Sequence, residues 1–368
     1  MTQTAFKSKL VYYYILAFTF YLIPEMTISQ ISPPEILLKN YRPRSIYNIP
    51  KTSIKKAKFS IIDMHTHPYA NSDKDIADWV KNMDAVGIEK SIVLTAATGA
   101  LFDSIYSKYA KYPDRFEVWC GFDYTGYDKP GFGPAAVAEL ERCVQVGAKG
   151  VGELGDKGKG LFYSNPVKAW GMHLDDPRMD PLIEKCAELG LPINIHVGEP
   201  IWFYEPMDST NDGLMSAYDW RLDNQKNIID LDGMIDILTR TVQKHPKTIF
   251  IACHLANLNH DLRRLGKLLD TYHNVYVDIS ARFAESATIP RFARSFFEKY
   301  QDKLVYGTDL GYDTDMYRIT FRILETEDEH FYEVDQLQYH WNLYGLGLDK
   351  TALEKLYRTN ALKILDTK

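Results

Sequence analysis

The sequence is poor in features that mark several common classes of protein. Its four cysteines are scattered over 368 residues without a CxxC pair, so a disulfide scaffold is not indicated, although the even count leaves one bridge open. No GxGxxG motif opens a helix after the first predicted strand, which weakens a dinucleotide-binding fold. A net charge of −6 and a pI near 6.0 give no reason to expect binding to nucleic acid or an anionic membrane.

The composition is that of a folded globular chain. Hydrophobic residues make up 45% and charged residues 25% of it, which argues against disorder. A chain of this length holds one large domain or two ordinary ones, and an α/β barrel of ~250 residues routinely forms one domain. The cysteines lie in strand-like and helix-like runs and are expected to be buried core positions: Cys120, Cys143, Cys186 and Cys253.

The N-terminus has a composition of its own. Lys7 and Lys9 precede the apolar run Leu10 to Pro24, and the small residues Thr27 and Ser29 follow it. This order is typical of a secretory signal peptide that is cleaved after Ser29. The run falls short of the roughly 20 apolar residues that span a bilayer, so a cleaved signal is favoured over an uncleaved membrane anchor. Residues 1–29 therefore predict an exported protein, periplasmic or extracellular.

Residues 30–58 carry four prolines and a basic finish, which predicts an extended lead-in segment rather than a domain. From residue 59 to 368 short apolar runs alternate with amphipathic stretches, which indicates strands alternating with helices. The eight strand candidates are FSIIDMH, SIVLTAA, RFEVWCGF, AKGVGEL, LPINIHV, TIFIACH, NVYVDIS and KLVYGTD.

Continuously apolar strands that alternate with helices predict a parallel sheet covered on both faces. Eight such units favour an α/β fold of the (β/α)8 barrel type, with an open doubly wound sheet as the alternative. Two longer inserts follow the fourth and fifth strands, at residues 157–178 and 198–227, and the second is rich in aromatic and acidic residues. Loops at that end of a barrel carry the residues that select the substrate.

Ionisable side chains recur where the predicted strands end. His65 and His67 lie two residues apart and so project to the same face of the first strand. The others lie at four further strand ends: Glu153, His196, His254 and Asp309. A single histidine at a strand end is usually only a hydrogen-bonded, partly buried side chain. Ionisable groups at five strand ends are hard to explain as structure, because burying them is costly unless they are paired or bind a metal.

Imidazole and carboxylate ligands together suit Zn²⁺, Mn²⁺ or Fe²⁺, and the absence of thiolate ligands favours a catalytic site with open positions. Asp63, two residues before His65, is equally well explained as a hydrogen-bond anchor of its strand. The residues alone therefore predict a divalent metal at the mouth of the barrel.

The chain from about Phe59 to its end resembles the amidohydrolase superfamily, and within it the amidohydrolase-related family 2. The matching segments are DMHTH, KGVGELG, NIHVGEP, ACHLAN, VYVDIS, YGTD and LYRTNALKIL, in this order. The resemblance implies a distorted (β/α)8 barrel and a divalent metal, commonly zinc, held by His65, His67, His196 and Asp309. For His254 it implies a catalytic acid or base, or a ligand of a second metal.

Glu153 leaves the number of metal ions open. In branches of the superfamily with two metals, a carboxylate or carboxylated lysine on the fourth strand bridges them, whereas many members of family 2 hold one metal. Arg282 is a candidate for clamping a substrate carboxylate, with a surface ion pair as the alternative. Trp202 is a candidate for lining a pocket for a ring or sugar, with packing of the insert on the barrel as the alternative.

The leading hypothesis is hydrolysis of an amide, ester or lactone by metal-activated water, with Asp309 moving the proton and His254 stabilising the oxyanion. A second hypothesis is a decarboxylase or other lyase of the same family, acting on a carboxylated substrate. A third is a secreted binding protein on a barrel that has lost its activity. The expected partner is a small-molecule substrate, and a homodimer is a further possibility.

Overall fold

The computed structural model describes residues 35–163 and 167–366, so the predicted signal segment 1–29 lies outside the described residues. The chain divides into two compact units, Met1–Tyr41 and Arg42–Lys368. The described part of the first unit contains the short 3-10 helix η2 (Leu38–Asn40). Within the described ranges, no helix has the length and apolar character needed to cross a bilayer.

The second unit is built on eight strands in a ring. They are β1 (Ile61–Thr66), β2 (Ile88–Leu94), β3 (Phe116–Trp119), β4 (Val151–Asp156), β7 (Ile193–Val197), β8 (Phe250–Ala252), β9 (Val275–Asp278) and β10 (Leu304–Val305). Neighbours pair in parallel within two runs, β1-β2-β3 and β4-β7-β8-β9-β10. A parallel bridge from Cys120 to Val151 and a 2.9 Å hydrogen bond from Met64 N to Tyr306 O join these runs. The predicted barrel is confirmed, and each predicted strand has its counterpart.

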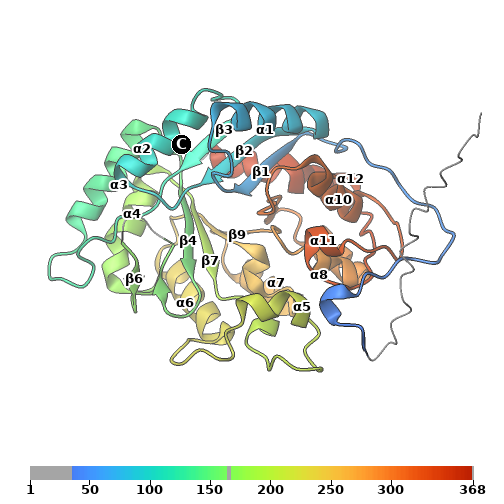
Figure 1. Ribbon diagram of the computed structural model, residues 1–368. Helices are drawn as coiled ribbons and strands as arrows, with labels where there is room; N and C mark the ends of the chain where they lie inside the picture. Colours follow the sequence, from blue (N-terminus) through green and yellow to red (C-terminus); the bar gives the residue numbers. More distant parts are fainter. Residues whose placement is uncertain (1–34, 164–166, 367–368) are drawn as a thin grey trace, which may run out of the picture. The chain divides into compact units, whose positions relative to one another are not determined.

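Helices cover the outside of this ring (Figure 1). They are α1 (Asp73–Val86), α2 (Gly99–Tyr109), α3 (Pro134–Val146), α4 (Asp180–Leu189), α6 (Leu231–Lys244), α7 (Leu262–Thr271), α8 (Phe283–Thr288), α9 (Pro290–Lys299) and α10 (Thr314–Glu325). The predicted closing helix consists of α12 (Lys350–Glu354), the π-helical turn η7 (Lys355–Thr359) and α13 (Asn360–Leu365).

Helix α1 illustrates how the sequence sets these boundaries. Ser72 caps its first turn in a reciprocal capping box with Asp75, and Gly87 ends it with φ of 93°. Glycine reaches this left-handed conformation without the steric cost of a side chain. The buried residues Ile76, Trp79, Met83 and Val86 recur at helical spacing and face the barrel. Local signals alone therefore define both the ends and the buried face of this helix.

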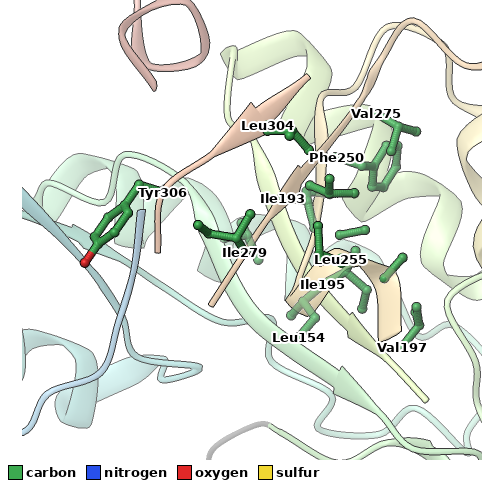
Figure 2. Close-up of a cluster of buried hydrophobic side chains, with 14 of the residues drawn as sticks. Leu154, Ile193, Ile195, Val197, Phe250, Leu255, Val275, Ile279, Leu304 and Tyr306 are labelled. Atoms are coloured by element: carbon green, nitrogen blue, oxygen red, sulfur yellow. The ribbon is translucent and has the colours of Figure 1, made fainter. Parts of the chain in front are cut away.

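The core has two layers because strand side chains alternate. Ile193, Ile195 and Val197 of β7 belong to a large cluster of buried apolar side chains, part of which is drawn in Figure 2. A smaller cluster joins Ile62, Ile92, Trp119, Ile251 and Val305 with Ile364 of α13. Its members come from strands on opposite sides of the ring, so it fills the barrel interior below the strand ends.

Three inserts surround the carboxyl ends of the strands. The first, after β4, contains the hairpin β5 (Gly160–Leu161) and β6 (Ala169–Trp170) and the turn η3 (Pro177–Met179). The second contains η4 (Ile201–Phe203), α5 (Leu214–Ala217) and η5 (Tyr218–Trp220). The third, residues 326–348 with α11 (Val334–Leu337), was not singled out in the sequence.

Candidate metal centre

Six ionisable side chains from five strand ends converge at the mouth of the barrel. Glu153 Oε1 lies 3.0 Å from His196 Nδ1, 3.5 Å from His254 Nε2 and 3.7 Å from His65 Nε2. Its other oxygen, Oε2, lies 3.5 Å from His67 Nε2. Asp309 Oδ1 lies 3.1 Å from His67 Nε2 and 3.9 Å from His65 Nε2. The structure thus brings together all the residues that the sequence predicted as metal ligands, together with His254.

Hydrogen bonds fix which nitrogen of each histidine faces inward. His196 Nε2 lies 2.9 Å from Gly198 O, His67 Nδ1 3.0 Å from Leu94 O, and His254 Nδ1 2.9 Å from Ser280 O. A carbonyl oxygen can only accept, so each of these nitrogens carries the proton. The opposite nitrogen of each ring therefore presents a lone pair to the centre, which is how metal-binding histidines are oriented.

His196 and His254 then face each other in a way that requires a cation. His254 Nε2 lies 3.1 Å from His196 Nδ1, and the proton of each ring is already directed outward. Two lone pairs at this distance repel unless a proton or a metal ion lies between them. His65 Nε2 is fully buried without a hydrogen-bond partner, and an orphaned polar atom of this kind is costly. A divalent cation at the centre would satisfy all three nitrogens, so the donor set fits a metal.

Most of the donor atoms form two overlapping groups that share His65, and His196 belongs to neither group. One contains His65, Glu153, Cys253 and His254, and the other His65, His67 and Asp309, with the ligand atoms of each group within 4.8 Å of one another. Glu153 directs one oxygen toward each group. This geometry suits a carboxylate that bridges two ions as well as one that binds a single ion.

Two residues of the centre were missed by sequence reasoning. The fully buried Asp278 accepts from His254 N at 2.9 Å through Oδ1, and its Oδ2 lies 2.9 Å from His65 Nδ1. It therefore orients two of the histidines at once. Cys253, predicted as plain core, donates to Asn194 Oδ1 at 2.9 Å and belongs to the first donor group. Burial raises the pKa of its thiol well above the usual value. All four cysteines are free and buried.

A left-handed turn after β8 places His254. The turn η6 (His254–Asn257) has φ values of 58°, 54°, 52° and 55° at four successive residues other than glycine. Each costs about 1–2 kcal/mol for a residue with a side chain, and such strain concentrates at functional sites. The turn aims His254 at Glu153 and brings Asn257 Oδ1 within 2.8 Å of an Arg282 guanidinium nitrogen.

The charges of the centre are strongly coupled. Burial opposes ionisation of Glu153, but contacts with the His196 and His254 rings in their protonated form, and the charge of His65, outweigh it and hold its pKa well below the usual value. Burial likewise opposes protonation of His65, yet Asp278 and Asp309 raise its pKa to about 10. The surrounding carboxylates raise the pKa values of His65, His67 and His196, whereas burial lowers the pKa of His254. Protons and a metal cation would compete for the same lone pairs.

A pocket of about 660 Å³ opens over this centre. Arg282 lines it and is 9% exposed. Its guanidinium donates to Asn257 Oδ1 and Ala281 O, which are neutral, and Glu285 Oε1 is 3.8 Å away. Burial raises the pKa of Glu285, and the charge of Arg282 opposes that shift. Arg282 is a pocket residue rather than half of a surface ion pair.

The aromatic lining differs from the one predicted. Trp202 is half-buried against the cluster Phe203, Ala217 and Leu222 and lies 5.6 Å from the ring of Trp341. Phe203 and Trp220 of the same insert line the pocket instead. Trp202 thus has a packing role, which the sequence analysis gave as the alternative to lining the pocket. The third insert adds Tyr339 to the lining.

The sequence profile of the amidohydrolase family matches residues 56–367. The chain belongs to this family. No curated protein shows significant sequence similarity to this chain.

Solved structures with a similar fold include two decarboxylases. The 2,6-dihydroxybenzoate decarboxylase from Rhizobium is 18% identical, with a TM-score of 0.52, and the match covers 84% of this chain and 99% of that one. A 5-carboxyvanillate decarboxylase from Novosphingobium aromaticivorans, solved with bound manganese and 3-methoxy-4-hydroxy-5-nitrobenzoic acid, is 16% identical, with a TM-score of 0.50 and coverage of 85% and 99%.

A third similar structure, a putative amidohydrolase from Staphylococcus aureus, is 15% identical, with a TM-score of 0.54 and coverage of 84% and 100%. At identities this low, the similarity shows a shared fold but not a shared reaction. The chain is therefore a barrel enzyme of the amidohydrolase family with a site that could bind metal, and its reaction has to be argued from the pocket.

Proposed function

We propose that the protein is a metal-dependent decarboxylase that acts on an aromatic carboxylic acid. The observation that carries this proposal is Arg282, a cation that donates hydrogen bonds only to neutral acceptors and lines an aromatic pocket that opens onto the candidate metal centre. A guanidinium binds a carboxylate in bidentate fashion. The similar structures that are decarboxylases of hydroxylated benzoates support the same reaction.

The residues proposed to hold the metal are His65, His67, His196, Asp309 and Glu153. Nitrogen and carboxylate donors suit Zn²⁺, Mn²⁺ and Fe²⁺ alike. The choice of zinc among them is a prediction from the sequence. When bound, the cation would polarise an oxygen of the substrate and favour negative charge on it. A metal ion binds only neutral imidazoles. The outward hydrogen bonds of His67, His196 and His254 hold the tautomer whose inward nitrogen carries the lone pair.

The chain's own residues then have distinct tasks. Arg282 binds and orients the carboxylate of the substrate, and the aromatic side chains Phe203 and Tyr339 exclude water from its ring. The bond between the ring and the carboxyl carbon breaks, carbon dioxide leaves, and the electron pair stays on the ring carbon. Asp309, which lines the pocket, delivers to that carbon a proton taken up from solvent, so that charge and atoms balance.

Hydrolysis, the leading hypothesis from the sequence, needs the same centre, with Asp309 accepting the proton of a water molecule. Decarboxylation is better supported because the pocket offers a carboxylate-binding cation next to the reacting position. His254 faces Glu153 and His196 through Nε2. We assign it to binding the metal or to stabilising charge on the substrate oxygen.

Isotope labelling distinguishes the two reactions. Protein supplied with Mn²⁺ or Zn²⁺ is incubated with hydroxybenzoates that carry ¹³C in the carboxyl group, in D₂O. We expect ¹³CO₂ in the headspace and one deuterium on the ring of the product, both detected by mass spectrometry. A parallel incubation with ester, amide and lactone substrates in H₂¹⁸O should leave them intact. Incorporation of ¹⁸O into a cleaved product without release of ¹³CO₂ would show a hydrolase instead.

A further inference from the structure

We infer that the substrate is a two-ring aromatic acid, whose second ring rests against Trp220 and Phe162 at the mouth of the pocket. This inference rests on the proposed function and adds the class of substrate. The acid group would lie at Arg282 and the metal centre, and the second ring would lie in the outer part of the same pocket. We call Trp220, Phe162 and Lys168 the outer subsite; all three line the pocket.

The volume of the pocket exceeds what one ring needs. A buried cavity of about 150 Å³ is enough to hold a benzene molecule, whereas this pocket measures about 660 Å³. A single-ring acid bound at Arg282 would leave most of that space to water. Ligand pockets usually enclose most of their ligand's surface, so a longer ligand fits this one better.

Exposed tryptophans lie at the pocket mouth. Of the tryptophans in the described ranges, Trp170 and Trp220 are more than half exposed, at 52% and 56%. Trp220 lines the pocket, and Trp170 stacks on the pocket-lining Phe162 with a ring separation of 6.1 Å and an angle of 2°. Large exposed apolar groups that gather at one place mark a binding surface. The two come from different inserts, so their position at one mouth does not follow from sequence proximity.

The outer subsite is held in place before a ligand arrives. Lys157 forms an ion pair with the buried Glu199, and its Nζ lies 5.1 Å from the Trp220 ring centroid and 5.6 Å from that of Tyr163. A cation over the ring face attracts it and restrains the indole. Trp220 thus presents its ring at little further entropic cost, which is what a stacking partner requires.

The outer subsite also suits an electron-rich ring. Lys168 Nζ lies 5.8 Å from the Trp170 ring centroid. Among residues 35–163 and 167–366, it has no ion-pair partner. Gln336 and Gln338 add exposed amides to the lining. A second ring that bears phenolic oxygens would accept hydrogen bonds from these groups. An aliphatic chain of the same length would leave them without partners.

The test compares two acids on the metal-loaded protein by isothermal titration calorimetry, using benzoate and a biphenyl carboxylate. We expect the biphenyl acid to bind at least about tenfold more tightly, as stacking energies indicate. In Trp220→Ala this ratio should fall several-fold while the affinity for benzoate stays unchanged. Trp220→Phe, which keeps a ring, should retain most of the ratio and excludes a folding defect as the cause.

Tyr218→Ala is the matched control. Tyr218 is 58% exposed in the same turn η5 but is absent from the pocket lining, so its removal should leave the ratio unchanged. Equal affinities for the two acids, or a ratio that Trp220→Ala leaves intact, would overturn the outer subsite even if single-ring acids release carbon dioxide. Tight, Trp220-dependent binding without release of carbon dioxide from any acid would support the subsite and contradict the decarboxylase.

Discussion

Asp309→Asn is expected to lower kcat about 10²–10⁴-fold while the protein keeps most of its metal. General acid catalysis contributes an effect of this size, and an amide cannot deliver the proton that the ring carbon needs. The amide oxygen can still occupy the position of Oδ1, 3.1 Å from His67 Nε2. The remaining proposed ligands, His65, His67, His196 and Glu153, are untouched. The measurement is kcat from carbon dioxide release, with the metal content of the same sample.

Asp315→Asn provides the control for this prediction. Asp315 lies six residues further along, at the start of α10, and forms an exposed ion pair with Arg318. Its substitution removes the same charge from the same side of the barrel without touching the pocket lining. We expect kcat to stay within about twofold, because exposed ion pairs contribute little. An unchanged kcat in Asp309→Asn would remove Asp309 from the mechanism.

Asp278→Asn is expected to weaken metal binding about 10- to 100-fold, the usual effect of losing a carboxylate that supports ligand histidines. The amide oxygen can still accept from His254 N, but its nitrogen then faces His65 Nδ1, now 2.9 Å from Asp278 Oδ2. An amide N–H turns His65 Nδ1 into an acceptor and moves the ring proton to Nε2. The inward lone pair of His65 is thereby lost.

The measurement is the competition of each variant with a chelator of known affinity, accompanied by circular dichroism to show that the barrel is folded. Asp302→Asn is the control, because Asp302 lies before β10 on an exposed surface and pairs with Lys355. It should bind metal as the unchanged protein does. Wild-type affinity in Asp278→Asn would show that the histidine tautomers are fixed by other contacts.

The strand ends could be predicted from the sequence because their signals are local. The two-residue spacing of His65 and His67 places both side chains on one face, and the alternation of apolar runs and helices places the other strand ends beside them. Asp278 lies in one of the predicted strands, but its partners His65 and His254 are 213 and 24 residues away. No spacing in the sequence reveals such contacts.

The pocket lining could not be predicted in the same way. The inserts have no periodicity that assigns a face, so nothing in the sequence shows that Trp202 packs against Trp341 while Trp220 lines the pocket. The third insert, which contributes Tyr339, looked like an ordinary connection. The reaction depends on the lining rather than on the barrel. The sequence therefore favoured hydrolysis, and the position of Arg282 in the pocket is what favours decarboxylation.

The central claim is that these side chains form a metal centre, and metal content per chain tests it most directly. Protein without residues 1–29 is analysed by inductively coupled plasma mass spectrometry beside a His65→Ala, His67→Ala double variant. The account predicts one or two divalent ions per chain in the parent and at least one fewer in the variant. Two ions would make Glu153 a bridge, and one would make it a ligand or neighbour of a single ion. No bound metal after incubation with zinc or manganese would contradict the account.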